Sequence, residues 1–347
     1  MKKIWVLLFV FIMLAAACSK GEENASEHDE READREEKGE IVEEETYQYP
    51  LTGLKTNDAI DNRIIGVMVN NHPSARPQSG LSKADIVFEI LAEGSITRFL
   101  ALFQSEIPGV IGPVRSAREY YFDLADRYGA LYVYHGAAEF IDEMIVNRGI
   151  SFLNGATYDN DGKLFKRESF RKAPHNSYLL ADAVYEVAEN KGYEISTDYE
   201  PLLFLKEEEI GAIEGESAQH VKITYSSNPM ENVEFEFDST TGKYTRFSGG
   251  EQTVELDSGT PVLVDNVFII ETYHEVIDKQ GRRSIDLQSG GNAYLIQNGK
   301  LQKVQWENED GRLVPVKDGK FIGLVPGKTW VNVIPSSPGL EQNVTFE

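Results

Sequence analysis

The sequence predicts an α+β protein, in which an N-terminal α/β domain is followed by a mainly antiparallel β domain. Three observations lead to this fold class. From about residue 50 to 195, apolar runs of strand length alternate with amphipathic stretches of helical spacing, as is typical of packed α and β layers. After about residue 200, the apolar runs are short and closely spaced, and no helical period stands out. Asn-Gly and Asp-Gly pairs separate several of these later runs, and such pairs are turn signals of β-hairpins.

In the first region, the predicted strands are runs rich in Ile, Val, Leu and Phe, each bounded by polar or turn residues. They cover residues 64–69, 85–91, 98–103 and 131–134. Three stretches carry apolar residues on one helical face and end at a glycine, which is a common helix stop. The first predicted helix starts at Ser116 as its N-cap and ends at Gly129. Two further helices are predicted over residues 137–148 and 179–191.

In the second region, only strands are predicted, and hairpin turns connect some of them. The strands cover residues 221–225, 233–237, 262–273, 293–297, 302–306 and 329–334. The turns are at Asn298-Gly299, Asp310-Gly311 and Asp318-Gly319. An acidic segment with two glycines, residues 206–216, separates the two regions. We therefore expect an N-terminal domain over residues 49–200 and a C-terminal domain over 215–345.

The N-terminus predicts secretion and lipid attachment. Lys2 and Lys3 precede an apolar run over residues 4–17, which is shorter than the roughly 20 residues of a membrane-spanning helix and fits a signal peptide over 1–17. Small residues lead to Cys18, in a pattern that resembles a bacterial lipobox. The alternative is an ordinary signal peptide that contains a cysteine. Lipid on Cys18 would anchor the protein to the outer face of the cell membrane.

Charge and cysteine content exclude several classes of function. The chain has 57 acidic against 34 basic residues, a net charge of −23, which argues against nucleic acid as a partner. Cys18 is the sole cysteine, so an intramolecular disulfide and a cysteine-rich zinc site are excluded. Between residues 19 and 50, 13 acids face four bases, and such a segment repels itself and extends. We therefore interpret residues 18–48 as a lipidated acidic tether; a solvated helix over 27–38 is the alternative.

Well-known catalytic and cofactor motifs are missing from the sequence. It contains no Gly-x-Gly-x-x-Gly after a strand, no P-loop lysine motif, no His-Glu-x-x-His and no Gly-x-Ser-x-Gly. This argues against the familiar nucleotide-binding, zinc-protease and serine-hydrolase classes. We expect no cofactor.

Basic residues gather at the start of the first predicted helix. Arg115 and Arg118 lie where the helix dipole favours acidic residues, and Arg98 begins a nearby strand. A bound anion would explain this arrangement, since helix N–H groups and guanidinium groups together bind phosphate or carboxylate. The alternative is that these arginines form structural salt bridges, for which the nearby acids are Glu89, Glu93, Glu119 and Asp123.

Two histidines are candidate functional residues. His135 follows a predicted strand, where ligands of open α/β sheets gather, and His175 lies beside Asn176 in a basic loop. Either histidine could act as a general acid or base, or could be a hydrogen-bonded structural residue. A metal shared by His72, His135 and His175 with Asp85 or Glu89 is a weaker interpretation, because no ligand pair has helical spacing; we expect no metal. The predicted anion-binding residues are Arg98, Arg115, Arg118, His135, His175 and Asn176.

Several segments resemble the YerB-like family of bacterial lipoproteins. They are residues 76–81, 84–89, 94–99, 111–118, 173–176 and 326–330. The most specific is the string Gly112-Pro113-Val114-Arg115-Ser116-Ala117-Arg118, and the resemblance covers roughly residues 50 to 340. It implies a membrane-anchored envelope protein of Gram-positive type with an N-terminal and a C-terminal domain. The family is described as a domain of unknown function, so the resemblance implies no catalytic residues.

These observations leave three hypotheses for function. The first is a non-catalytic envelope lipoprotein that binds an anionic glycan or a cell-wall synthesis protein through the region of Arg98, Arg115 and Arg118. The second is an enzyme acting on phosphorylated or glycan substrates, with His135 or His175 as acid/base and the arginines holding the anion. The third is a structural scaffold without a small ligand.

Overall fold

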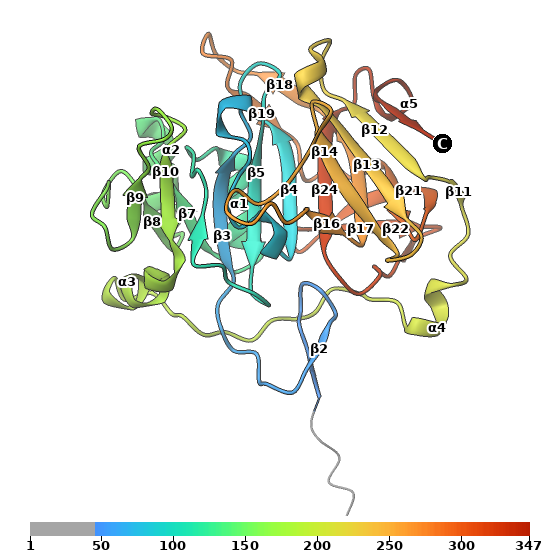
Figure 1. The fold of residues 1–347 in the computed structure, drawn as a ribbon, viewed down its shortest axis with the longest axis horizontal. Coiled ribbons are helices and arrows are strands. Elements are labelled where there is room, and N and C mark those ends of the chain that lie inside the picture. The colour runs from blue at the N-terminus through green and yellow to red at the C-terminus, as the bar shows by residue number, and fades with distance from the viewer. Residues whose placement is uncertain (1–45) are drawn as a thin grey trace, which may run out of the picture. The chain divides into compact units, whose positions relative to one another are not determined.

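The computed structural model describes residues 46–347. The predicted signal peptide, Cys18 and most of the predicted tether lie outside the described residues. Within this part the chain is mostly β, with 25 strands and five short α-helices (Figure 1). The predicted fold class is therefore supported only in its β-rich character, and an α/β arrangement of the N-terminal region is not clearly shown.

The largest element is a sheet of twelve strands that includes strands from both halves of the chain. Along its path it contains β23 (Lys320–Phe321), β22 (Arg312–Lys317), β21 (Lys300–Glu309), β20 (Gly291–Gln297), β17 (Asn266–Thr272), β24 (Thr329–Pro335), β4 (Ile86–Leu91), β5 (Thr97–Phe103), β3 (Ile65–Asn70), β7 (Leu131–Tyr134) and β8 (Phe152–Asn154). The short β11 (Glu216–Ser217) pairs with β21.

Strand β24 joins the two halves of this sheet (Figure 1). It lies between β17 and β4 and is parallel to both. Every residue of β24 before Pro335 is buried, as expected for a strand with neighbours on both sides and covered faces. Its register places Trp330 opposite Val87 and Asn332 opposite Glu89. Residues far apart in the sequence therefore meet on this strand.

Four smaller sheets complete the β structure. A six-stranded sheet contains β15 (Glu251–Gln252), β14 (Lys243–Ser248), β13 (Asn232–Asp238), β12 (His220–Thr224), β25 (Val344–Phe346) and β16 (Leu263–Val264). A three-stranded sheet contains β6 (Val110–Ile111), β10 (Ser177–Leu180) and β9 (Phe165–Arg167). The two remaining pairs are β1 (Tyr47–Gln48) with β2 (Lys55–Thr56), and β18 (His274–Val276) with β19 (Arg283–Ile285).

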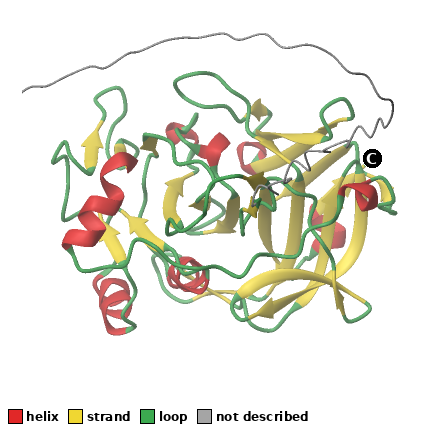
Figure 2. Ribbon diagram, turned by 90° about the horizontal axis from the view of Figure 1, so that it is seen from below, coloured by secondary structure: helices red, strands yellow, loops and turns green. Residues whose placement is uncertain are grey.

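The helices are short and lie around the sheets (Figure 2). The α-helices are α1 (Glu119–Arg127), α2 (Glu139–Asn147), α3 (Val184–Asn190), α4 (Glu207–Ile210) and α5 (Leu340–Asn343). Single turns of 3-10 helix cover Pro73–Ala75, Leu81–Lys83, Ala181–Ala183 and Pro229–Glu231.

The hydrophobic core has two parts, one on each face of the large sheet. Successive residues of β5 alternate between them: Phe99 and Ala101 belong to one part, and Leu100 and Leu102 to the other, because side chains of a strand point to opposite faces. The first part also contains apolar residues of β12, β13 and β14. The second part contains apolar residues of α1 and α2. The six-stranded sheet and α3 therefore cover one face, and α1 and α2 cover the other.

Most strand predictions are confirmed. The runs at 64–69, 85–91 and 98–103 form β3, β4 and β5, and the run at 131–134 is β7. The three predicted hairpin turns are also present. Asn298 and Gly299 have φ angles of 48° and 74°, and a type I′ turn requires positive φ at both positions.

Two predictions of local structure are wrong, and several strands were not predicted. The residue at the N-cap of α1 is Arg118 and not Ser116, and its side chain makes no capping hydrogen bond. The predicted helix over 179–191 begins as strand β10 and becomes α3 at Val184, because Leu179 pairs with Ile111 and Phe165 in a sheet. The predictions also omitted β14 and β22, whose alternating polar residues hide the apolar face.

Candidate functional site

The segment before α1 brings the predicted site residues near one another. Its backbone pairs with three strands: Arg115 N–H donates to Met68 O at 2.9 Å, Val114 N–H to Ser177 O at 2.7 Å, and Arg115 O accepts from His135 N–H at 3.0 Å. The ends of β3, β7 and β10 therefore converge on Arg115. Sequence reasoning placed Arg115 and His135 in one region, and these bonds show how the backbone does so.

Arg98 and Arg118 share one carboxylate. The Arg98 Nη2 atom lies 2.5 Å from Glu93 Oε2, and Arg118 Nε donates to Glu93 Oε1 at 2.6 Å. Arg98 Nη1 also donates to the Ser116 carbonyl oxygen at 3.0 Å. Both guanidinium groups are thus paired with an acid, which is the salt-bridge alternative for these two residues. Glu93 also removes the conflict between Arg118 and the helix dipole.

Arg115 differs from these two arginines. No hydrogen bond or ion pair of its side chain is found with any residue from 46 to 347. The side chain is partly buried, and burial together with the charge of Arg98 lowers its pKa to about 10. Its charge also lowers the pKa of His72, His135 and His175. We call these four residues the His–Arg cluster.

The hydrogen bonds of His72 and His175 determine which ring nitrogen carries the proton. Asn70 Nδ2 lies 2.9 Å from His175 Nδ1, and Ser74 N–H donates to His72 Nδ1 at 3.1 Å. Both Nδ1 atoms therefore accept, so in the neutral rings both Nε2 atoms carry a hydrogen. The two rings stack with centroids 4.5 Å apart. Each ring thus has an N–H group for which the described residues supply no acceptor.

Both ring nitrogens of His135 have a hydrogen-bond partner. Arg167 Nη2 lies 3.2 Å from its Nε2 and can only donate, so Nε2 accepts and Nδ1–H faces Ser177 Oγ at 2.8 Å. Arg167 also donates to Asn176 Oδ1 at 2.9 Å and pairs with Asp159. Asn176 therefore positions Arg167, and Arg167 in turn positions His135. The sequence analysis instead assigned Asn176 and His135 to direct contact with the ligand.

Burial is the largest cause of the lowered pKa of all three histidines. After burial, the largest effects are the charges of Arg76 on His72, Arg167 on His135 and protonated His72 on His175. The cluster is therefore electropositive although the whole protein is strongly acidic. No group of three or more metal-ligating side chains was found in residues 46–347.

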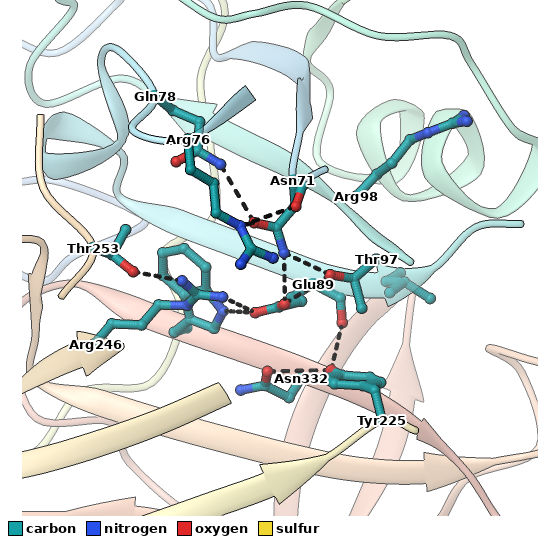
Figure 3. A network of polar contacts seen from close by, with 12 residues as sticks. Asn71, Arg76, Gln78, Glu89, Thr97, Arg98, Tyr225, Arg246, Thr253 and Asn332 are labelled. Carbon is teal, nitrogen blue, oxygen red and sulfur yellow. Dashed lines mark hydrogen bonds and ion pairs between the residues drawn. The ribbon is translucent and has the colours of Figure 1, made fainter. Parts of the chain in front are cut away.

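A second polar cluster surrounds Glu89 on β4 (Figure 3). Its carboxylate is fully buried and accepts from Arg246 Nη2 at 2.8 Å, Trp330 Nε1 at 2.9 Å and Thr97 Oγ1 at 2.8 Å. Asn71 Nδ2 donates to it at 3.2 Å. We call Glu89 and these four partners the Glu89 network. It joins β4 and β5 with β14 and β24. The sequence analysis offered Glu89 as a salt-bridge partner for other arginines and, more weakly, as a metal ligand.

Arg246 is the cation of this network and is also fully buried. Its guanidinium carbon lies 4.5 Å from the centroid of the Trp330 ring and 5.2 Å from that of Phe99, which are cation–π distances. Its Nη1 donates to Thr253 Oγ1 at 2.7 Å. The sequence gave no signal for this residue, since Arg246 lies in a strand that was not predicted.

A larger cavity lies elsewhere. It has a volume of about 670 Å³, and its lining includes Arg63, Tyr128, Tyr193 and Tyr199. None of the six predicted anion-binding residues contributes to it. No helix in the described part of the chain has the length and apolar character needed to cross a membrane.

Fold and sequence together define the family. The N-terminal domain model of a family of proteins of unknown function, DUF3048, matches residues 51–194, and the C-terminal domain model of the same family matches residues 221–331. The chain belongs to this family.

A relative and a solved structure agree with this assignment and confirm the resemblance to YerB-like proteins. The chain is 47% identical over 288 residues to "Putative lipoprotein YerB" of Bacillus subtilis (strain 168), covering 82% of this chain and 86% of the relative. It is also similar to the crystal structure of the YerB protein from Bacillus subtilis, with a TM-score of 0.79 and 44% identity over 87% of this chain and 99% of the solved one.

Proposed function

We propose that this protein is an extracytoplasmic lipoprotein, anchored through Cys18 to the outer face of the cell membrane, that binds an anionic ligand of the cell envelope without catalysis. The ligand would be a glycan that carries phosphate or carboxylate groups, held at the His–Arg cluster. The observation that supports this proposal most strongly is the half-buried Arg115, which has no acidic partner among residues 46–347.

Arg63 and Arg76 also lack an ion pair, but both donate hydrogen bonds to carbonyl oxygens, whereas the Arg115 side chain has no hydrogen-bond partner among residues 46–347. Arg98, Arg118, Arg148 and Arg167 each lie within ion-pair distance of a carboxylate. Removing a cation from water without a counter-ion is unfavourable. An anion at Arg115 would offset this cost and would also accept hydrogen bonds from the Nε2–H groups of His72 and His175.

Binding is favoured over catalysis by the surroundings of the two candidate histidines. A histidine that acts as general base is commonly oriented by a carboxylate. The partners found for His135 in the described structure are Arg167 and Ser177, and the partner of the His175 ring nitrogen is Asn70. An envelope enzyme with His135 or His175 as acid/base therefore has less support than a binding protein.

Replacing Arg115 by glutamine should abolish anion binding at the His–Arg cluster without destabilising the free protein. The wild type should melt at a higher temperature with increasing phosphate at constant ionic strength, because a ligand that binds only the native state stabilises it by about 2.7 kcal/mol at 100 times its Kd. The variant should lack the part of this response that comes from the His–Arg cluster, so that phosphate stabilises it less than the wild type. Arg148→Gln, which removes an exposed arginine paired with Glu119 and Asp123, is the matched control and should keep it. A marked loss of stability in Arg115→Gln would show instead that Arg115 is a structural residue.

Anion binding should strengthen as the pH falls from about 8 to about 6. Burial and the nearby cations hold the pKa of His72 and His175 below the ordinary 6.5 in the free folded protein. The free protein therefore loses stability as the pH falls below that value, since the unfolded chain binds more protons. A bound anion favours the protonated rings, so binding takes up protons. Calorimetry in two buffers of different ionisation enthalpy would measure this uptake; release of protons on binding would contradict the site.

Replacing Cys18 by serine should prevent lipid attachment. The thiol is the only one in the chain, and serine cannot form the thioether that joins a diacylglycerol to cysteine. Labelled fatty acid should enter the wild type and not the variant, and the variant should appear in the soluble extracellular fraction. Incorporation of the label into Cys18→Ser would refute the lipoprotein assignment.

A further inference from the structure

A small cavity lies next to the Glu89 network, between the loop at residues 76–78 and strands β14 and β15. Its volume is about 120 Å³. The lining comprises Arg76, Pro77, Gln78, Arg246, Ser248, Glu251, Gln252, Thr253 and Val254. Residues from the N-terminal and C-terminal family regions thus share one cavity, which we call the Arg76–Arg246 cavity.

Two buried donors among these lining residues have no acceptor. Arg246 is fully buried and Ser248 is 4% exposed. The Arg246 Nε–H and the Ser248 hydroxyl have no hydrogen-bond partner in the described structure. A buried donor left unpaired costs about 1–3 kcal/mol, so most such groups in proteins are paired. An acceptor in the cavity would pair both.

Of the two arginines that line the cavity, only one has a carboxylate partner among the described residues. Glu89 balances Arg246, at 2.8 Å. Arg76 donates to Asn71 O and Oδ1, both at 3.1 Å, and to Met230 O at 3.1 Å, all of which are uncharged. No carboxylate within ion-pair distance of Arg76 is found between residues 46 and 347. In Figure 3 the guanidinium groups of Arg76 and Arg246 both point toward the region above Glu89.

The pKa of Arg76 agrees with this arrangement. Burial and the charge of Arg246 lower it to about 10. Glu251 acts in the opposite direction and raises the pKa of Arg76. It is an exposed residue at the cavity wall and forms no ion pair with Arg76. The two arginines therefore repel one another, and the carboxylates that partly offset this repulsion, Glu89, Glu251 and Glu231, all lie beyond ion-pair distance of Arg76.

We propose that the Arg76–Arg246 cavity binds a single small oxyanion group, a carboxylate or a phosphate, through Arg76, Arg246 Nε–H and the Ser248 hydroxyl. Guanidinium groups match the geometry of such oxyanions. The cavity has room for about four waters, at roughly 30 Å³ each, which suits one oxyanion and not a whole sugar ring. This site shares no residue with the His–Arg cluster, although the charge of Arg76 also acts on His72, and the proposal does not depend on the function proposed for that cluster.

The test uses the full chain, purified in detergent, in the Arg115→Gln background, so that the His–Arg cluster does not contribute. Melting temperature is followed with increasing acetate, phosphate or chloride at constant ionic strength. We expect acetate or phosphate to stabilise this protein more than chloride does. Adding Ser248→Ala or Arg76→Gln should weaken the apparent affinity at least about tenfold, the effect of losing one charge-assisted hydrogen bond.

Arg63→Gln is the matched control. Arg63 is also a partly buried arginine that donates to carbonyl oxygens, those of Gly129 and Glu194, and it lies at the large cavity. The Arg63→Gln variant should leave the response of the melting temperature to anions unchanged. Because phosphate stabilises proteins in general by exclusion from their surface, only the part of the response that differs between Ser248→Ala and this control counts.

The outcomes separate the two oxyanions and can overturn the proposal. A response to acetate alone identifies a carboxylate site, and a response to phosphate alone a phosphate site. If Arg76→Gln fails to fold, Ser248→Ala decides, since it removes only an unpaired hydroxyl and should leave the free protein as stable as before or more so. Equal anion responses in Ser248→Ala and Arg63→Gln, or no response beyond that of chloride, would overturn the proposal.

Discussion

Replacing Glu89 by alanine should lower the free energy of unfolding by about 3–5 kcal/mol, the range for breaking one partner of a buried ion pair. The reason is the Arg246 guanidinium, which is fully buried and would lose its counter-ion. The Trp330, Thr97 and Asn71 donors would lose their acceptor as well. Urea denaturation followed by circular dichroism measures the change.

Two further variants make this expectation specific. Glu186→Ala breaks the exposed pair with Lys163 and should change stability by less than about 1 kcal/mol. Arg246→Met combined with Glu89→Gln removes both charges and keeps an amide oxygen as an acceptor for Trp330. This double variant should be more stable than Arg246→Met alone. If Glu89→Ala and Arg246→Met each lower the free energy of unfolding by no more than Glu186→Ala does, the Glu89 network is not a major source of stability.

Replacing Trp330 by alanine should cost a similar amount, about 3–5 kcal/mol, the range for truncating a buried large aromatic residue. The ring is fully buried on β24 and packs edge-on against Phe99, with centroids 5.1 Å apart. It also lies beneath the Arg246 guanidinium. The alanine variant would leave a void at the strand that joins the two halves of the large sheet. Thermal and urea unfolding measure the loss.

The phenylalanine variants separate packing from hydrogen bonding. Trp330→Phe keeps a ring but loses the Nε1–H bond to the charged Glu89, and hydrogen bonds to charged groups contribute about 1.5–3 kcal/mol. Trp306→Phe is the matched control, because Trp306 is equally buried but donates to the neutral Glu271 carbonyl oxygen, at 3.0 Å. Trp306→Phe should lower the free energy of unfolding by less than Trp330→Phe does. Equal costs would mean that the charge of Glu89 adds nothing to the bond.

Many elements of this fold could be predicted because residues that are adjacent or close in the sequence specify them. The runs that became β3, β4 and β7 contain mainly apolar residues, and the Asn298-Gly299 turn is specified by two adjacent residues. Pairing between distant strands left no such signal. Leu179 resembles the start of a helix in its sequence, but it pairs with Ile111 and Phe165, which lie far away along the chain.

The candidate site shows the same division. Sequence reasoning selected Arg98, Arg115 and Arg118 by residue type and position at a helix start, but it did not distinguish the two that share Glu93 from the one that does not. That difference depends on where the loop after β4 places one carboxylate. Arg246 was invisible for a related reason, because its partner Glu89 lies 157 residues earlier in the chain.

The position of β24 has a consequence for the nascent chain. The strand occupies the middle of the twelve-stranded sheet, between β17 and β4, but comes late in the order of synthesis. Until residues 329–335 have left the ribosome, β4 and β17 both present open edges, which tend to pair with other chains. The nascent protein therefore depends on one of its last segments to close the sheet, and it is most prone to aggregate before that segment is made.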